Sequence, residues 1–485
     1  MNINEDNCNI DCIMKKDCFS SRIGYVLAAA GSAVGLGNIW RFPYLTAKYG
    51  GGIFLLTYLI LVLTFGYSLL IAENCIGRMT GKGPIGAFRD LCSGKDSFLG
   101  AVRIGGWLNS IAPIIIVPYY CVIGGWVTKY CVAMLITPIS AFHKDATVLV
   151  DGALKDASTY YFTSFITSTW EPILYFCIFA AILILVVGMG VEKGIERFNK
   201  ILMPLLVLMC IGICIYCCFL PNAGEGLRYY LYPDSSKFSY MTVVAAMGQL
   251  FFSLSIAMGI MVTYGSYMRQ EDNLVGNVNQ VEIFDTGVAF LAGMMIIPAV
   301  VSFGGKKAAE SAGPGLVFCT MPKVFASFPG GRLIAIIFFL LVLFAAATSA
   351  ISLLETNVQT IGQELKMSRK RAIVLGFVEI IVVGIVTILG YSVLSNVHPL
   401  AFIERYKGMD ILDTLDFLAN NIIMPLGAIL TTILVTSVIG LERFCKEVDP
   451  TGAKWKRCGI FQFCMCVIVI PCLLIVLLNS IGVLK

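Results

Sequence analysis

Residues 31–38 read Gly31-Ser32-Ala33-Val34-Gly35-Leu36-Gly37-Asn38, inside an apolar run over 23–43. The run is long enough to cross a bilayer as a helix, which takes roughly 20 apolar residues. Its clustered glycines and polar residues predict that this helix is interrupted. A second run, over 242–267, carries a comparable interruption, Ser253-Leu254-Ser255-Ile256-Ala257-Met258-Gly259.

The two interruptions occupy matching places in the chain. They fall in the first and sixth of eleven apolar runs, which are the first helices of two successive five-helix blocks. Because five is odd, the second block has inverted topology. Interrupted helices at matching positions of inverted halves indicate a binding site near the bilayer midplane. For one helix alone, close packing at glycine would be the favoured explanation, whereas for the matched pair we favour a binding site.

An interruption in the bilayer has a direct chemical consequence. It frees amides and carbonyls that lipid cannot hydrogen-bond, so they are tolerated only beside a polar cavity or a ligand. Half-helix N-termini favour an anionic group, and freed carbonyls favour a cation. The pattern therefore predicts a site for a zwitterion and a metal cation.

The composition supports a membrane protein without a soluble domain. Of 485 residues, 58% are hydrophobic and 13% are charged, whereas a soluble protein carries about 25% charged residues. Most of the 18 cysteines lie in apolar runs and are expected to be free thiols. The eleven predicted spans are 23–43, 53–76, 107–136, 172–190, 201–220, 242–267, 283–303, 333–361, 373–394, 417–440 and 459–482.

Basic residues predict the orientation. With a cytoplasmic N-terminus, 21 of the 35 lysines and arginines fall in cytoplasmic segments. The net charge of +5 reflects this bias, and no nucleic-acid binding is inferred from it. The predicted organisation is a cytoplasmic tail (1–21), a first five-helix repeat (22–220), a second inverted repeat (221–440), and a cytoplasmic loop with the eleventh helix (441–485).

Several motifs resemble the neurotransmitter:sodium symporters. The first-helix motif continues through Ile39-Trp40-Arg41-Phe42-Pro43-Tyr44 to Gly50-Gly51-Gly52. The resemblance covers roughly 16–440 and implies an all-α, LeuT-type fold with discontinuous helices 1 and 6, in a bacterial plasma membrane. Its other motifs are Glu73 with Gly77-Arg78, Lys193-Gly194-Ile195-Glu196-Arg197, Gly248-Gln249-Leu250-Phe251-Phe252-Ser253-Leu254-Ser255, Ala346-Ala347-Thr348-Ser349 and Ser368-Arg369-Lys370.

The resemblance implies two sodium ions. All-oxygen coordination is what such a hard cation needs. The first site would use the Ala33 carbonyl with the side chains of Asn38, Ser253 and Asp285. The second would use the carbonyls of Gly31, Val34 and Ala345 with the hydroxyls of Thr348 and Ser349. Considered alone, these two hydroxyls would more often bond back to their own helix.

The resemblance also implies an amino-acid substrate. Its carboxylate would meet the amides near Leu36 and Gly37 and the hydroxyl of Tyr120. Monoamine carriers have an aspartate where this chain has Gly35, which argues for amino acids over amines. The remaining substrate contacts would come from Ala33, Ile116, Phe252, Ser253, Ser255, Met258 and Leu353. Because this lining is mostly apolar, we expect a hydrophobic side chain.

The same resemblance implies gates on both sides. The outer gate would pair Arg41 with Asp416, with Gln249 bridging. The inner gate of the family pairs an arginine with an aspartate, but this chain has Lys16 and Gln363 there. Glu73 would satisfy the unwound part of helix 6, and Glu355 is expected only to pack or bond inside the bundle.

The favoured function is a sodium-coupled amino-acid importer that is independent of chloride. Asp285 supplies a fixed carboxylate that would replace the anion, and it would accept a proton once sodium leaves. A non-transporting sensor, a membrane enzyme and a proton-driven carrier are the alternatives. No metal cluster or nucleophile–base arrangement in the sequence favours an enzyme. Oligomeric state is not predicted.

Overall fold

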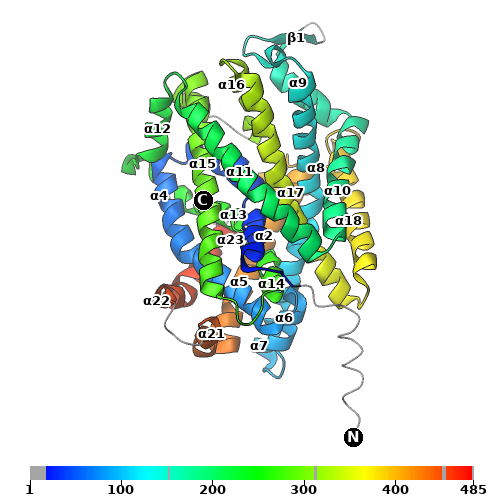
Figure 1. Cartoon of the computed structure of the whole chain (residues 1–485), viewed down its shortest axis with the longest axis vertical. Coiled ribbons are helices and arrows are strands. Elements are labelled where there is room, and N and C mark those ends of the chain that lie inside the picture. Colours follow the sequence, from blue (N-terminus) through cyan, green and yellow to red (C-terminus); the bar gives the residue numbers. More distant parts are fainter. Residues whose placement is uncertain (1–17, 151–152, 311–313, 450–454, 483–485) are drawn as a thin grey trace.

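The structure is a computed structural model that describes residues 18–150, 153–310, 314–449 and 455–482. This part of the chain forms a bundle of long helices (Figure 1). The two helical termini that flank each predicted interruption lie inside the bundle, surrounded by the other spans. The fold therefore agrees with the all-α membrane protein predicted from the sequence.

The first half of the chain supplies the helices up to the fifth predicted span. They are α2 (Arg22–Ala33), α3 (Phe42–Lys48), α4 (Gly52–Leu61), α5 (Tyr67–Thr80), α6 (Pro84–Leu91), α7 (Ser97–Ala101), α8 (Ile104–Ile136), α9 (Ala157–Thr167), α10 (Trp170–Gly188) and α11 (Arg197–Cys218). Strands β1 (Thr147–Val150) and β2 (Ala153–Asp156) pair antiparallel in the predicted outer loop.

The second half of the chain is also built from helices. Its helices are α12 (Ala223–Leu231), α13 (Tyr240–Ser253), α14 (Ile260–Ser266), α15 (Leu274–Glu310), α16 (Thr320–Ala326), α17 (Gly331–Glu364), α18 (Arg369–Leu389), α19 (Ile411–Phe417), α20 (Met424–Ile433), α21 (Leu441–Val448), α22 (Cys458–Phe463) and α23 (Val469–Ser480). Turns of π-helix lie at Gly37–Arg41, Val62–Gly66, Val191–Glu196, Leu418–Ile423, Leu434–Gly440 and Cys464–Ile468.

The spans match the sequence prediction. Among the described residues, nine continuous helices are long and apolar enough to cross a membrane, and the bent pair Arg22–Ala33 with Gly37–Lys48 makes a tenth. The short apolar helix α13, followed by α14, corresponds to the predicted sixth span. Each of the eleven predicted runs therefore has a helical counterpart.

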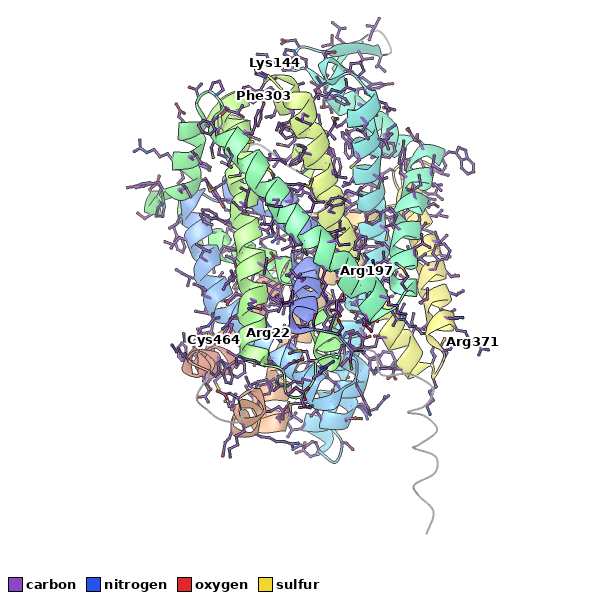
Figure 2. The ribbon with its side chains drawn as sticks, in the orientation of Figure 1. Arg22, Lys144, Arg197, Phe303, Arg371 and Cys464 are labelled. Carbon is purple, nitrogen blue, oxygen red and sulfur yellow. The ribbon has the colours of Figure 1, made fainter. Side chains whose placement is uncertain are left out.

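The two ends of the bundle differ in what they carry. Helices α9, α12 and α16 and strand β1 lie at one end, and α6, α7, α21 and α22 lie at the other (Figure 1). Figure 2 places Lys144 and Phe303 toward the first end and Arg22, Arg371 and Cys464 toward the second. The loops predicted to be cytoplasmic thus share one end, as alternating spans require.

Candidate functional site

The break in helix 1 occupies three residues. Helix α2 ends at Ala33, and the chain continues in a π-helical turn that begins at Gly37. The two halves are bent by 48°. The side chain of Asn38 folds back over the break, and its Oδ1 accepts a hydrogen bond from the Gly35 amide at 3.2 Å.

The break in helix 6 is longer and differently built. Helix α13 ends at Ser253 and α14 begins at Ile260. Between them, Ser255, Ala257 and Gly259 have φ values of 53°, 59° and 69°, the left-handed region that L-residues adopt only at a cost. The freed amide of Ala257 donates to Glu73 Oε1 at 2.7 Å, the role that the resemblance implied for Glu73.

Three side chains of the first predicted sodium site converge. Asn38 Nδ2 donates to Asp285 Oδ1 at 2.7 Å, and Ser253 Oγ lies 2.9 Å from the same oxygen. The Tyr58 hydroxyl donates to Ser253 Oγ at 3.2 Å. Asn38, Ser253 and Asp285 are all fully buried. The carboxylate of Asp285 on α15 is therefore the point where the broken helices 1 and 6 meet the predicted seventh span. Ala33 lines the adjoining cavity.

The residues of the second predicted sodium site lie between α2 and α17. Ser349 Oγ donates to the Ser32 carbonyl at 3.0 Å, which links the two helices. Thr348 Oγ1 instead donates within its own helix, to the carbonyls of Phe344 and Ala345 at 3.0 and 3.1 Å. A Cβ atom at Gly31 would lie 3.3 Å from Thr348 Cβ, so the two helices touch at this point.

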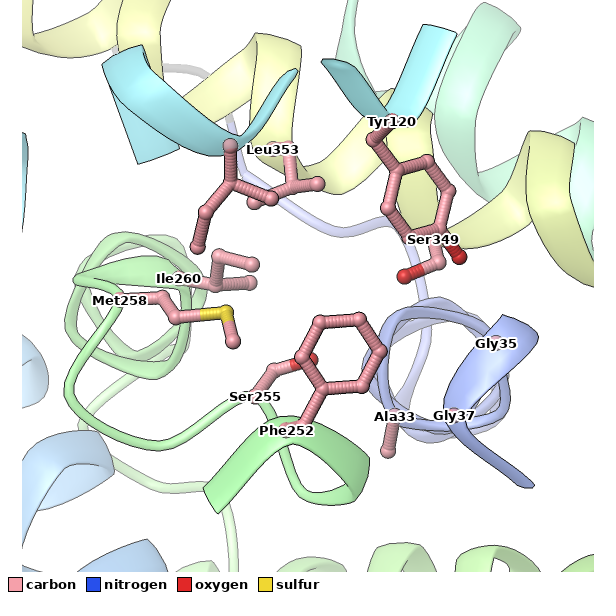
Figure 3. Close-up of a pocket in the computed structure, with 11 residues that line it drawn as sticks. Ala33, Gly35, Gly37, Tyr120, Phe252, Ser255, Met258, Ile260, Ser349 and Leu353 are labelled. Atoms are coloured by element: carbon pink, nitrogen blue, oxygen red, sulfur yellow. The ribbon is translucent and has the colours of Figure 1, made fainter. Parts of the chain in front are cut away.

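A cavity lies between the two breaks. Figure 3 shows residues of helix 1, helix 6 and the segments of Tyr120 and Leu353 on its different sides. The predicted substrate residues that line it are Ala33, Gly37, Ile116, Tyr120, Phe252, Ser255, Met258 and Leu353.

Two predicted substrate residues are not in the lining of this cavity. Leu36 and Ser253 instead contact residues of the site. The Leu36 amide donates a hydrogen bond to the Tyr120 hydroxyl at 3.1 Å, and the Ser253 hydroxyl donates one to Asp285. Gly35, Ile260 and Ser349 line the cavity although they were not predicted as substrate contacts. A Cβ atom at Gly35 would lie 2.9 Å from both the Ser349 and Tyr120 hydroxyl oxygens, so only glycine leaves this approach open.

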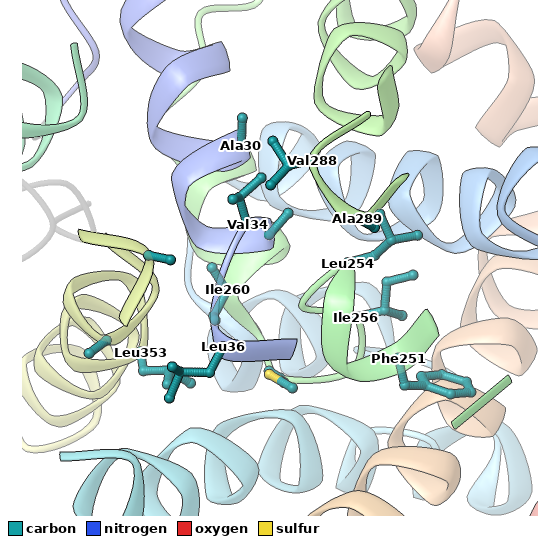
Figure 4. Close-up of a cluster of buried hydrophobic side chains, with 14 of the residues drawn as sticks. Ala30, Val34, Leu36, Phe251, Leu254, Ile256, Ile260, Val288, Ala289 and Leu353 are labelled. Atoms are coloured by element: carbon teal, nitrogen blue, oxygen red, sulfur yellow. The ribbon is translucent and has the colours of Figure 1, made fainter. Parts of the chain in front are cut away.

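The surroundings of the cavity are largely apolar. Figure 4 shows a cluster of buried apolar side chains from the segments around both breaks, among them Ala30, Val34, Leu254 and Ile256. In such surroundings hydrogen bonds and charges interact more strongly than in water.

The predicted outer-gate pair does not form an ion pair in this conformation. The guanidinium of Arg41 lies 5.5 Å from the ring centroid of Phe252. Asp416 instead accepts hydrogen bonds from the Tyr119 hydroxyl at 3.0 Å and from Asn420 Nδ2 at 2.6 Å. Gln249 does not bridge the pair, because its Nε2 donates to the Gly37 carbonyl at 2.9 Å.

At the inner gate only one predicted partner can be placed, since Lys16 lies outside the described residues. Gln363 Oε1 accepts a hydrogen bond from the Gly83 amide at 2.9 Å.

Sequence reasoning assigned no partner to Glu355, which is fully buried and forms an ion pair with Arg369 at 2.6 Å. The Tyr267 hydroxyl donates to the same carboxylate at 2.8 Å. Arg369 in the motif Ser368-Arg369-Lys370 was the available signal.

Comparisons with known proteins agree with this geometry. The sodium:neurotransmitter symporter family model matches residues 16–156 and 157–485. An uncharacterized sodium-dependent transporter of Bacillus subtilis, YhdH, is 34% identical over 468 residues, which cover 96% of this chain and 98% of the relative. The sodium- and chloride-dependent taurine transporter of the dog is 29% identical, over 68% of this chain and 58% of the relative.

A solved structure is also similar along nearly its whole length. The crystal structure of MhsT in complex with L-phenylalanine superposes with a TM-score of 0.83 at 35% sequence identity. The match covers 96% of this chain and 99% of that chain. The likeness therefore extends over both broken helices and the cavity between them.

Proposed function

The chain belongs to the sodium:neurotransmitter symporter family, and from that membership we propose that it imports an amino acid with a hydrophobic side chain, coupled to sodium and without chloride. It is accordingly a multi-pass membrane transporter rather than an enzyme. The observation that carries the proposal is the cavity between the two broken helices. Its apolar side holds Phe252, Met258 and Leu353, and its polar side holds Tyr120 and the helix-1 break.

The polar side suits the common part of an amino acid. The Leu36 amide and the Tyr120 hydroxyl lie within hydrogen-bond distance of one another, so one carboxylate could meet both. Gly35 places no carboxylate in the cavity to hold an amine. MhsT, solved with L-phenylalanine, supports an amino acid with a large apolar side chain.

Two sodium ions per substrate are part of the proposal. The first would bind at Asn38, Ser253 and Asp285 with the Ala33 carbonyl, beside the substrate carboxylate. The second would bind at Thr348 and Ser349 with carbonyls of Gly31, Val34 and Ala345. One charge crossing ~100 mV gains ~2.3 kcal/mol, and a tenfold gradient adds ~1.4 kcal/mol. Two ions thus supply ~7.4 kcal/mol, enough for ~10⁵-fold accumulation, and a proton carried outward in the return step would lower the electrical part of this energy.

Chloride independence rests on Asp285. A carboxylate already lies where the first sodium ion would bind, fully buried and held by Asn38 and Ser253. A cation in these low-dielectric surroundings needs one compensating charge, and Asp285 supplies it without a bound anion. When sodium leaves, the carboxyl would take a proton and carry it outward during the return step.

The membrane arrangement is proposed on the same basis. The N-terminus would face the cytoplasm of a bacterium, and the chain would lie in the plasma membrane. Residues 22–220 and 221–440 would form the two inverted repeats, each beginning with one broken helix. The tail (1–21) and the segment 441–485 would lie outside this repeat.

Uptake into proteoliposomes tests the proposal. Purified protein should accumulate radiolabelled L-phenylalanine or L-leucine when sodium is outside, and replacement of chloride by gluconate should leave the rate unchanged. Uptake driven equally well by a proton gradient without sodium would contradict it. A reversal potential that indicates one sodium ion per substrate would remove the second site from the proposal.

A further inference from the structure

The residues that flank the connection from α21 to α22 hold two helices of the site. Arg457 binds Glu282 of α15 with both guanidinium nitrogens, at 3.0 and 2.6 Å, and also binds Asn279 Oδ1 at 2.5 Å. Its guanidinium carbon lies 3.5 Å from the ring centroid of Tyr67 on α5. Trp455 Nε1 donates to the Tyr67 hydroxyl at 2.8 Å.

The other flank makes a similar attachment. Glu447 of α21 accepts from Arg78 of α5 through its backbone carbonyl, and its carboxylate lies 3.5 Å from the same guanidinium. Arg78 is nearly fully buried. Helix α5 is thus bound on both flanks, and α15 is bound on the α22 flank. They also carry Glu73, which caps the break in helix 6, and Asp285, which is one helical turn from Glu282.

Two free thiols, one from each flank, lie close together. Cys445 Sγ on α21 and Cys458 Sγ on α22 are 3.7 Å apart, and Gln462 Nε2 lies 3.4 and 3.7 Å from them. Both cysteines are partly exposed. A disulfide requires sulfur atoms at ~2.05 Å, so a small movement of the side chains would bring the pair to bonding distance.

We propose that Cys445 and Cys458 are a redox modification site that regulates transport. The thiolate of one cysteine attacks a small disulfide such as oxidised glutathione, forms a mixed disulfide and releases one glutathione thiolate. The second cysteine attacks that mixed disulfide, which forms the Cys445–Cys458 bond and releases the second glutathione thiolate. The cysteines lose two electrons to the glutathione disulfide, and their two protons pass to water or to the glutathione thiolates.

The bond would act through the attachments on both flanks. It would tie α21 covalently to α22, so the ends that hold Arg78 and Glu282 could no longer separate. Helix α15, which is bound on the α22 flank, would then be fixed relative to α5, which is bound on both flanks. Any step of the transport cycle that moves these helices apart at this end would be slowed. Reduction would restore the free thiols, since cytosolic thiol pools reduce exposed disulfides.

Disulfide mapping in the full-length protein tests the chemistry without any transport assay. The protein in proteoliposomes is exposed to oxidised glutathione, free thiols are alkylated, and digested peptides are analysed by mass spectrometry. We expect a peptide that links Cys445 to Cys458, and its loss after dithiothreitol. Exchange that produces only glutathionylated or other linked cysteines would overturn the proposal.

Uptake measured on the same samples tests the regulation. Sodium-dependent uptake of L-phenylalanine should fall ~5-fold or more on oxidation and recover on reduction. Cys445→Ser and Cys458→Ser should each abolish the effect, while Cys466→Ser, which removes an exposed thiol on the same span, should retain it. A linked pair with unchanged uptake would overturn the regulatory role, and a slowdown that persists in Cys458→Ser would assign it to another thiol. The regulatory role rests on the proposed transport function, whereas disulfide mapping needs no substrate. A linked pair in a protein that takes up no amino acid would therefore count against the proposed function and not against the redox site.

Discussion

The two broken helices solve the same problem in different ways. In helix 1 the break is short, and its freed groups reach side chains of other spans: the Leu36 amide meets Tyr120, and the Gly37 carbonyl meets Gln249. In helix 6 the break runs from Leu254 to Gly259, and three residues adopt left-handed backbone conformations. Its Ala257 amide is capped by a buried carboxylate, Glu73.

We call the helix-1 break adjustable and the helix-6 break fixed, because their freed backbone groups have different partners. Hydroxyl and amide partners such as Tyr120 and Gln249 can be exchanged for a ligand at little cost, because each contact is a single neutral hydrogen bond. The Glu73 carboxyl and the Ala257 amide are both fully buried, so it is costly to leave either without its partner. We therefore expect changes near helix 1 to alter ligand binding, and changes near helix 6 to alter the stability of the fold.

The largest expected effect is on the ligand side. Thr348→Ala with Ser349→Ala removes two of the predicted oxygen ligands that face helix 1, each contributing ~1–3 kcal/mol, so sodium-dependent uptake should fall roughly 100-fold. The sodium concentration for half-maximal uptake should rise, while the yield of folded protein should not change. Thr356→Ala, further along α17, is the matched control, because the Thr356 hydroxyl donates to the Ser352 carbonyl of its own helix. Unchanged sodium dependence would show that these hydroxyls only bond to their own helix.

Asp285 joins the two breaks, so its charge should matter to both. Asp285→Asn keeps the side-chain shape and removes the negative charge next to the first predicted sodium ion. We expect uptake to be poor in gluconate, by ~10-fold or more given the loss of a buried opposite charge, and to recover when chloride is added. If wild-type uptake slows when chloride is replaced by gluconate, the proposal that the Asp285 carboxylate takes the place of a bound chloride ion is wrong.

Glu73 tests the fixed break. Glu73→Ala leaves the buried Ala257 amide without its acceptor, a loss of ~1–3 kcal/mol, and should lower the melting temperature in detergent. Glu73→Gln retains a carbonyl oxygen for the same amide and should preserve most of that stability. Equal melting temperatures for the two variants would show that the cap contributes little to the fold.

Tyr120→Phe tests the adjustable break by a smaller change. The phenylalanine keeps the ring but removes the hydroxyl that faces Leu36, so we expect substrate affinity to fall ~5- to 10-fold, corresponding to ~1 kcal/mol. Melting temperature should stay close to that of the wild type. A large loss of stability with unchanged affinity would reverse the distinction between the two breaks.

The smallest effect is expected at the inner gate. Gln363→Asp would restore an acidic partner for Lys16, while removing the acceptor that Gln363 now offers to the Gly83 amide through its side-chain carbonyl. We expect the labelling rate of a cysteine introduced on the cytoplasmic pathway to fall two- to threefold, as for a shift of ~0.5 kcal/mol in a two-state equilibrium. Reactive native thiols must first be removed. An unchanged labelling rate would exclude this pair as a gate.

Sequence reasoning predicted the places of both breaks because glycine and serine mark them locally. Most residues that line the cavity are among those it assigned to the substrate, since one quoted motif contains Phe252 and Ser255 and the resemblance also implied Tyr120. It missed Ile260 because an apolar residue at the start of α14 carries no local signal; its direction depends on the left-handed residues before it. It named Arg41 and Asp416 but could not give their separation, which depends on the conformation of the bundle rather than on residue type.

Helix α2 also has a mechanical consequence. Its 12 residues extend about 18 Å from the break toward the tail. A rotation of about 10° at the break would move the far end by roughly 3 Å. That displacement equals the length of the hydrogen bonds by which Ser20 and Ser21 hold Glu196, which are 2.6–3.0 Å. The helix is therefore a lever arm, and a slight turn where a ligand binds would break or remake a whole set of contacts at the opposite end.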